Sequence, residues 1–504
     1  MDELKVGIVQ KTLSYISEEM GVVLRNSSSS PNIRERLDFS CAIFDSHGRV
    51  VAEAEHIPVH LGSMAWASKK LIEAYESLGL GSGDVLMTND PYLTGTHLND
   101  VTMVSRYSDF YIAVKAHYVD IGGPKAGSLN PFAKYLYEEG IVIKPIRAAS
   151  NWVLSKEATN LARSVRNPRL FVADVNAQLS SIRWGYMQLK EFIEKKTLDF
   201  IKSAIDSYIE ITRESYAQTL IPLAGTHGSS EIPLELPNLD IAHIRLSVKI
   251  DTEKVFFDFT ESDDEVDYNL NAVEGISYAA ASFFIKSFFG AQKDVNQGLY
   301  DVIHVKTRKG SILNPNYPRA VGAGNLETSQ RILQSIILAF SKITDEVPSL
   351  GPGTMSNLII SYKDRTYYET NGGGGSATKW EDGENGVQWG MTNTLNTPIE
   401  VIESELPILF TEYGIRRNSG GKGRRKGGDG IVREFESLDD ITVITLLSQT
   451  RFPSYGIGGT NGSPGRIVVY RSGSEVVQTN GYLELNLKKG DRVRLETPGA
   501  GGHK

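Results

Sequence analysis

GTHLNDVTMVSRYSDFYIAVKAHYVDIGG, residues 95–123, holds two runs of β-branched and aromatic residues separated only by Ser108-Asp109. Such residues favour strands, and two residues are enough to turn one strand back on the next. We therefore predict an antiparallel hairpin in which Tyr107 pairs with Phe110. Because side chains alternate along each strand, this pairing sets which residues share a face along the whole hairpin.

Polar side chains then gather at the open end of the hairpin. The predicted register places Asp100 opposite His117 and His97 opposite Asp120, and opposite residues share a face of the sheet. His97 is three residues from Asp100, the wrong parity for one face of a continuous strand. We therefore expect the loop that precedes His97 to turn its side chain inward.

Two imidazoles and one or two carboxylates at one point are a ligand set for a divalent transition metal such as zinc, manganese or iron. A set of His97, Asp100 and His117 leaves positions open for water or substrate, as a catalytic metal requires. The alternative is that each histidine forms an ordinary hydrogen bond with its nearby aspartate. The pattern by itself leaves both interpretations open.

Other candidate site residues carry weaker signals. His60 follows a proline-broken stretch, so it is not part of a helical zinc pair, but it could line a pocket. Asn89 and Asp90 lie at the predicted end of a strand, where both turns and sites are common. Asn325 and Glu327 open a predicted helix, whose N-terminus either binds an anion or is capped by its own side chains.

Composition excludes several functional classes. A net charge of −8 gives no indication of nucleic-acid binding. No apolar run approaches the roughly 18 residues of a membrane span, and the N-terminus lacks the apolar core of a signal peptide. Cys41 is the only cysteine, so no disulfide can form within the chain. We therefore expect a cytoplasmic protein in a reducing compartment.

The pattern of apolar residues predicts a mixed α/β (α+β) fold with several domains. Helical spacing predicts helices over 3–25, 64–78 and 327–342, and residues 38–55 are typical of a β-hairpin. The predicted regions are an N-terminal α/β region with the His/Asp hairpin (1–155), a helical region (156–235), a second α/β region (236–355) and a β-rich region of glycine loops (356–504).

Several long segments resemble one known family. They are SPNIRERLDFSCAIFDSHGRVVAEAEHIPVHLGSM (30–64), GDVLMTNDPYLTGTHLNDVTMV (83–104), AHYVDIGGPKAGSLNP (116–131) and NSGGKGRRKGGDGIVRE (418–434). Together they resemble the hydantoinase B / 5-oxoprolinase family, which also includes related large subunits of acetone and acetophenone carboxylases. The resemblance runs from about residue 3 to the end of the chain.

The resemblance implies one half of an ATP-dependent enzyme that acts on a small molecule as a hetero-oligomer. In this family a separate A-type subunit of actin-like fold binds ATP and phosphorylates the substrate, and the B-type chain completes the reaction. No GxxxxGK[ST] phosphate-binding loop occurs in this chain, so we expect the partner to bind the ATP. We expect ring opening of a cyclic amide, such as 5-oxoproline or a hydantoin, by a metal-activated water.

The resemblance also implies roles for the candidate residues. His97, Asp100 and His117 are the expected metal ligands, with Asp120 or His60 as the base or as the group that orients the water. The expected substrate-binding residues are Asn89, Asp90, Asn325 and Glu327. Two alternatives stay open: a subunit of an ATP-dependent ketone carboxylase, and a non-catalytic scaffold subunit.

Overall fold

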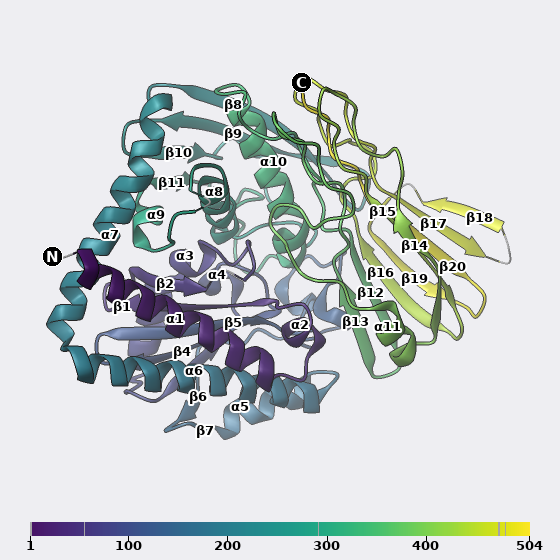
Figure 1. The fold of residues 1–504 in the computed structure, drawn as a ribbon. Helices are drawn as coiled ribbons and strands as arrows, with labels where there is room; N and C mark the ends of the chain where they lie inside the picture. The colour runs from purple at the N-terminus through teal and green to yellow at the C-terminus, as the bar shows by residue number, and fades with distance from the viewer. Residues whose placement is uncertain (1–2, 55, 291, 472–473, 479) are drawn as a thin grey trace.

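The computed structural model describes residues 3–54, 56–290, 292–471, 474–478 and 480–504. Within these residues it contains four β-sheets. Helices pack on the first two sheets, and the last two face each other at the C-terminal side of the molecule (Figure 1). The predicted mixed α/β class is therefore confirmed.

The N-terminal sheet carries the candidate site and has the strand order β2-β1-β5-β4-β3-β6-β7. Its strands are β1 (Phe39–Asp45), β2 (Val50–Ala54), β3 (Val85–Thr88), β4 (Asp100–Tyr107), β5 (Phe110–His117), β6 (Ile146–Ser150) and β7 (Val153–Leu154). The long helices α1 (Glu3–Ser27) and α6 (Pro168–Lys196) pack on it. Strands β1 and β5 are buried along their whole length, as central strands covered on both faces are.

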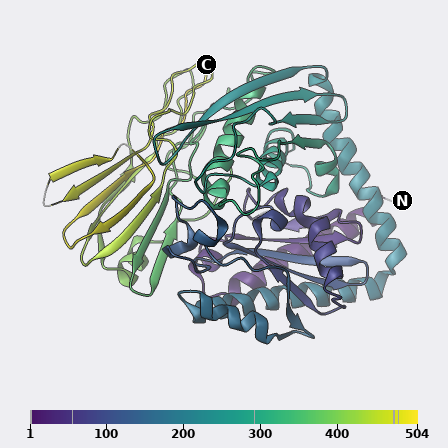
Figure 2. The ribbon, with the colours of Figure 1, turned by 180° about the vertical axis from the view of Figure 1, so that it is seen from behind.

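The second sheet has the order β11-β10-β9-β8 and is linked to the first by the long helix α7 (Leu198–Leu220), which runs along one edge of the molecule (Figure 2). Its strands are β8 (His227–Glu235), β9 (Ile241–Ile250), β10 (Val255–Asp258) and β11 (Ile303–Lys306). Helix α10 (Ser329–Phe340) packs on β8 and β9, and α8 (Glu274–Phe289) packs on α10. Burial largely alternates along β8 and β9 because only one face is covered.

The C-terminal part is a β-sandwich with its own apolar core. One sheet has the order β13-β12-β16-β19 and the other β14-β15-β20-β17-β18. The strands are β12 (Asn357–Tyr362), β13 (Arg365–Glu369), β14 (Ile408–Ile415), β15 (Ile431–Ser437), β16 (Ile441–Leu446), β17 (Arg466–Arg471), β18 (Ser474–Gln478), β19 (Leu483–Leu487) and β20 (Arg492–Glu496). A second, larger core spans the two preceding sheets and their helices.

Short helices complete the described structure. They are α2 (Pro31–Arg34), α3 (Ser63–Ser77), α4 (Pro91–Thr94), α5 (Lys156–Leu161), α9 (Gln297–Asp301), α11 (Ile399–Glu405), four 3-10 turns (Ala126–Ser128, Leu136–Glu138, Ala162–Ser164 and Ile221–Leu223) and a π-helical turn, η5 (Gly324–Thr328). None of the helices in the described part of the chain combines the length and apolarity that crossing a membrane demands.

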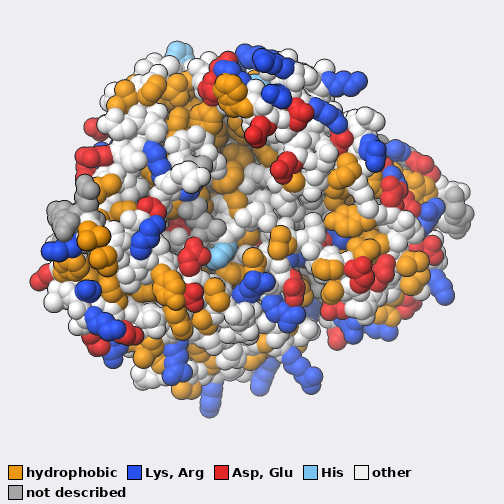
Figure 3. All heavy atoms as spheres, in the orientation of Figure 1, with side chains coloured by type: hydrophobic (Ala, Val, Ile, Leu, Met, Phe, Trp, Pro, Cys, Tyr) orange, Lys and Arg blue, Asp and Glu red, His pale blue; other side chains and the backbone are white. Residues whose placement is uncertain are grey.

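Glycine loops next to the β-sandwich pack backbone against backbone. A Cβ on Gly374 would lie 1.9 Å from the carbonyl oxygen of Gly428, and a Cβ on Gly428 would lie 1.9 Å from that of Glu384. Only glycine permits such an approach. Basic side chains gather near the C-terminus at the top of the molecule (Figure 3), where the loop containing the exposed Lys422 and Arg424 also lies.

The structure bears on the predicted elements one by one. The helices expected over 3–25 and 64–78 are α1 and α3, and the hairpin expected over 38–55 is β1 and β2. Glu55, the last residue of that predicted hairpin, lies outside the described residues. The helix expected over 327–342 begins two residues later, because Gly324–Thr328 adopts π-helical hydrogen bonding. The four domain ranges stay a prediction.

Candidate metal centre

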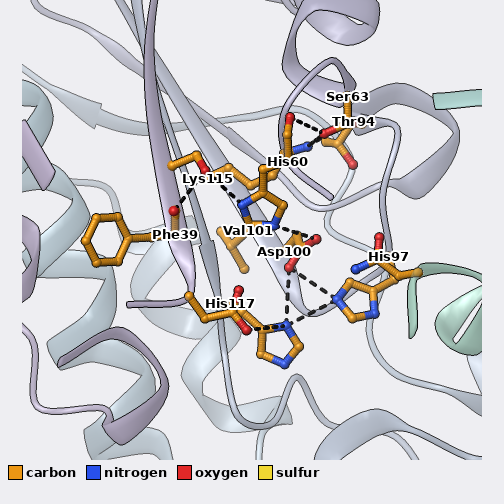
Figure 4. A network of polar contacts seen from close by, with 12 residues as sticks. Phe39, His60, Ser63, Thr94, His97, Asp100, Val101, Lys115 and His117 are labelled. Carbon is orange, nitrogen blue, oxygen red and sulfur yellow. Dashed lines mark hydrogen bonds and ion pairs between the residues drawn. The ribbon is translucent and has the colours of Figure 1, made fainter. Parts of the chain in front are cut away.

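The candidate centre lies where β4 begins and β5 ends. Asp100, the first residue of β4, pairs with His117, the last residue of β5. Tyr107 pairs with Phe110 at the other end, so the predicted register is confirmed. His97 lies in the loop between α4 and β4, and its ring turns toward the same point as the other two polar side chains (Figure 4).

Three atoms of these residues form a nearly regular triangle. His97 Nε2 lies 3.2 Å from Asp100 Oδ1 and 3.2 Å from His117 Nδ1, and His117 Nδ1 lies 3.3 Å from the same carboxylate oxygen. Two ligands bonded at about 2.1 Å to one ion are about 3.0 to 3.4 Å apart for angles between 90° and tetrahedral. All three side chains are buried. The donor set therefore fits a divalent transition metal.

Hydrogen bonds alone leave this triangle unsatisfied. His97 Nδ1 lies 3.2 Å from the carbonyl oxygen of Gly322, which can only accept, so Nδ1 carries the proton of the neutral ring. His97 Nε2 and Asp100 Oδ1 then present lone pairs to one point. If His117 Nδ1 donates to one of them, His117 Nε2 becomes a buried acceptor with no partner among the described residues. A bound cation removes this conflict.

Burial and charge oppose each other at the ionisable groups of the centre. Burial disfavours the ionised form of Asp100, but the rings of His97 and His60 outweigh burial and hold the carboxyl pKa well below its usual range. Burial likewise disfavours the imidazolium form of His97, yet the Asp100 carboxylate outweighs it and raises the His97 pKa. Asp100 is therefore ionised, which is the form that binds a metal.

His60 contacts the second oxygen of the Asp100 carboxylate. Its Nε2 lies 3.3 Å from Asp100 Oδ2, and its Nδ1 lies 3.2 Å from Ser40 Oγ. A proton on Nε2 makes His60 a donor to Asp100 and leaves Nδ1 to accept from the Ser40 hydroxyl. This arrangement keeps Asp100 Oδ1 pointed at the triangle (Figure 4). The predicted role of His60 as a base stays a prediction; its contacts suit it to orient Asp100.

Asp38 is a candidate donor that the sequence reasoning missed. Its Oδ2 lies 3.8 Å from His117 Nδ1, and its carbonyl oxygen accepts from the His117 backbone N–H. Asp38 immediately precedes β1, and the pairing of Phe39 with Ala116 sets it beside His117. Only the pairing of β1 with β5 brings these residues together, and no local pattern in the sequence indicates that register.

Glu139 holds the backbone that anchors His97. Its two carboxylate oxygens accept from the N–H groups of Val321, at 3.0 Å, and Gly322, at 2.9 Å. The carbonyl oxygen of Gly322 in turn contacts His97 Nδ1. Burial raises the pKa of Glu139 to about 7, although the two backbone hydrogen bonds oppose that rise. Glu139 is thus a second residue that sequence reasoning missed.

The structure does not bring Asp120 to the centre, in contrast to the expected pairing with His97. The β4–β5 ladder ends at the pair of Asp100 and His117, so strand parity no longer applies beyond it. The Asp120 carboxylate accepts from the backbone N–H of Gly127 and pairs with Arg166 at 2.6 Å. Those contacts hold the following loop, away from the triangle of ligand atoms.

The four predicted substrate-binding residues are also apart from the triangle. Asn89 bonds the backbone of Leu98, Ile141 and Ile143, and Asp90 caps α4 and pairs with Lys144. Glu327 is fully buried and accepts from three groups: the backbone N–H groups of Met355 and Ser448 and the side chain of Asn357. Asn325 is buried, and its Oδ1 has no partner among the described residues. Their role in substrate binding stays a prediction.

Tyr368 connects the centre to the C-terminal half of the molecule. Its ring stacks on that of His117, with centroids 5.3 Å apart and planes 13° apart. The Tyr368 hydroxyl donates to Asn357 Oδ1, and Asn357 Nδ2 donates to Glu327 Oε1. A chain of contacts therefore links Glu327 to His117 through two intervening side chains.

A sequence profile of a known family matches residues 2–503, and its description is hydantoinase B/oxoprolinase. The chain belongs to this family. An uncharacterised protein of Methanocaldococcus jannaschii is 39% identical over the whole chain, which covers 91% of that protein. 5-Oxoprolinase 1 of Arabidopsis thaliana is 32% identical over 99% of the chain, which spans only 42% of the plant protein. The B-type subunit of a putative D-/L-hydantoinase from a Pseudomonas species is 26% identical, with 100% and 90% covered.

Two solved structures share the fold. The ATP-dependent caprolactamase from Pseudomonas jessenii has a TM-score of 0.91 and 24% identity, with 100% of this chain and 91% of that chain covered. A nucleotide-free acetone carboxylase has a TM-score of 0.90 and 15% identity, with 100% and 76% covered. The fold is therefore one in which both a lactamase and a carboxylase are known.

Proposed function

We propose that this chain is the B-type half of an ATP-dependent hydrolase that opens a cyclic amide such as 5-oxoproline or a hydantoin. Family membership and relatives named as a 5-oxoprolinase and as a hydantoinase component support the reaction class. The chain spans 42% of the plant 5-oxoprolinase, so the ATP-dependent half of the reaction belongs to another chain, of the A type. The observation that carries the proposal is the buried triangle of His97, Asp100 and His117.

The triangle would hold the divalent metal. His97 Nε2, Asp100 Oδ1 and His117 Nδ1 would be its ligands, and the Asp38 carboxylate, 3.8 Å from His117 Nδ1, is near enough to add a fourth. A zinc, manganese or iron ion bound there supplies Lewis acidity, which polarises a carbonyl group and acidifies a water. This set differs from the expected one in that Asp38 takes the place of Asp120.

The surrounding residues prepare the ligands. His60 donates its Nε2 proton to Asp100 Oδ2, so the other carboxylate oxygen keeps its lone pairs for the ion. Gly322, held by Glu139, accepts the Nδ1 proton of His97 and leaves Nε2 unprotonated. The burial of all these side chains excludes bulk water, which strengthens their electrostatic interactions.

Turnover with the A-type partner tests the proposal. The two subunits are co-expressed, and phosphate release from ATP is measured with 5-oxoproline, a hydantoin or a ketone, each with and without bicarbonate. Substrate-dependent release that ignores bicarbonate, together with a ring-opened product, is expected. Release that requires bicarbonate and incorporates its carbon would replace the hydrolase with a carboxylase.

A scaffold role is tested by removing the centre alone. The metal-stripped complex and the His117→Ala complex are both expected to lose product formation while the subunits stay associated. His243→Ala is the matched control, because His243 forms a His–Asp pair with Asp263 outside the centre. Full product formation by the His117→Ala complex would make this chain a scaffold and contradict the proposal.

A further inference from the structure

A cavity of about 450 Å³ lies beside the candidate centre and has polar walls. Its rim is formed by exposed residues and its floor by buried ones. The exposed rim includes Ser29, Arg365, Ser404 and Glu405, and the buried floor includes Asn32, Arg36 and Tyr368. The volume suits a small molecule rather than a polymer.

Arg36 brings an incompletely paired positive charge to this floor. Its side chain is 2% exposed, and its Nη1 donates to Asn32 Oδ1 at 3.0 Å. The nearest carboxylate oxygen, Oε1 of Glu369, is 3.9 Å from Nη2, too far for a direct hydrogen bond. Arg36 Nε and Asn32 Nδ2 are buried donors with no hydrogen-bond partner among the described residues. Two unsatisfied donors thus lie side by side at the floor.

The carboxylate nearest to Arg36 is already engaged by a second arginine. Arg433, also buried, donates through Nη1 to Glu369 Oε2 and to Asn371 Oδ1. The other oxygen of Glu369 accepts from the backbone N–H of Thr397. Two buried guanidinium groups therefore share one carboxylate. Burying a charge is costly unless it is paired, so the cavity floor favours an anion.

The cavity and the candidate centre share a wall. The Arg36 guanidinium lies 5.4 Å from the centre of the Tyr368 ring, and that ring stacks on His117 at 5.3 Å. Arg36 also precedes Asp38 by two residues, and Asp38 Oδ2 lies 3.8 Å from His117 Nδ1. A small anion bound at Arg36 would therefore lie next to the ligand atoms of the centre.

We propose that this cavity is an oxyanion subsite, in which Arg36 Nε and Asn32 Nδ2 bind a carboxylate or phosphate group of a small molecule. It rests on the proposed function for the source of the anion: the carboxylate of a substrate such as 5-oxoproline, or the phosphate released from the activated substrate. Arginine suits both groups, because its planar donors match their oxygens.

Calorimetric titration of the full chain tests the subsite with three probes. They are 5-oxoproline, 2-pyrrolidinone, which is the same ring without the carboxylate, and inorganic phosphate. Saturable binding of 5-oxoproline or phosphate is expected, with no measurable binding of 2-pyrrolidinone. Binding of 5-oxoproline alone assigns the site to the substrate carboxylate, and binding of phosphate alone assigns it to the released phosphate. Binding of neither anion overturns the subsite.

Two variants locate the bound anion. Arg36→Gln is expected to weaken anion binding by at least about ten-fold, as loss of a hydrogen bond to a charged group does. Asn32→Ala removes the neighbouring donor without disturbing Glu369, so it gives the same test if Arg36→Gln does not fold. Arg34→Gln is the control, because Arg34 is exposed and pairs with Glu35 outside the cavity. Unchanged affinity in both cavity variants also overturns the proposal.

These results separate the subsite from the proposed function. Anion binding that depends on Arg36, in a complex that releases no phosphate from ATP, would leave the subsite standing and remove the hydrolase. Substrate-dependent turnover with a KM that neither Arg36→Gln nor Asn32→Ala changes, together with absent anion binding, would keep the hydrolase and remove the subsite.

Discussion

The end of the β4–β5 hairpin and the glycine loops beside the β-sandwich solve opposite packing problems. At the hairpin, polar side chains fill the space, and their positions follow from a strand register. In the glycine loops the space is filled by backbone, since a Cβ on Gly374, Gly428 or Gly420 would lie 2.0 Å or less from a carbonyl oxygen. The comparison shows that the first region depends on side-chain chemistry and the second on the absence of side chains.

The largest effect is expected from a single methyl group in the glycine loops. Gly428→Ala places a Cβ 1.9 Å from the carbonyl oxygen of Glu384, and backbone on both sides prevents relaxation. We expect a loss of about 3 kcal/mol of stability, measured as a lower urea midpoint. Gly414→Ala is the control, because no atom lies within 4 Å of its added Cβ. Equal midpoints for the two variants would remove the distinction between the regions.

Removal of one ligand should empty the hairpin centre without unfolding the chain. His117→Ala is expected to weaken binding of zinc or manganese by more than about 100-fold, because only two atoms of the triangle remain. Equilibrium dialysis measures the affinity, and circular dichroism checks the fold. His243→Ala should bind the metal as the unmodified chain does. A His117→Ala protein that keeps a full complement of metal would refute the assignment.

A smaller effect on metal affinity is expected from Glu139, which touches no ligand atom. Glu139→Gln keeps the shape but offers one acceptor to two backbone N–H groups, so Gly322 should shift and His97 should lose its orientation. We expect metal affinity to fall about 10-fold.

Glu235→Gln is the matched control for this variant. Glu235 is also buried and accepts from backbone N–H groups, those of Thr450, Arg451 and Phe452, but it belongs to the C-terminal side. Its substitution should lower the thermal midpoint and leave metal affinity unchanged. If both variants bind metal equally, Glu139 has a structural role only.

The smallest effect concerns pH and separates the two regions again. Burial raises the pKa of Asp174 on α6 to about 7, although its hydrogen bond from Ser28 opposes the shift. The folded state therefore holds a proton that the unfolded state has lost between about pH 4 and 7, so stability falls as pH rises through this range, by at most about 1.4 kcal/mol per unit. Asp174→Asn should flatten that dependence in urea unfolding at pH 5 and pH 8. An unchanged slope would show that Asp174 is ionised in the folded state.

Strand parity explains both the success and the failure of the site prediction. It placed Asp100 opposite His117 correctly, because a two-residue turn and alternating side chains are local properties. It failed at Asp120, because the ladder ends at His117 and the chain turns through Gly122 and Gly123, both with positive φ. Beyond the end of a ladder, the sequence spacing no longer reports which residues are neighbours.

The sequence by itself determined the mixed α/β class, the first helices, the hairpin and its three candidate ligands, because each depends on a repeat of a few residues. Only the tertiary structure decided that Asp38, His60 and Tyr368 surround them. These residues come from three separate segments, and β1 and β13 reach the hairpin only after long stretches of chain have folded. Long-range pairing depends on the burial of whole faces, which no short pattern of residues records.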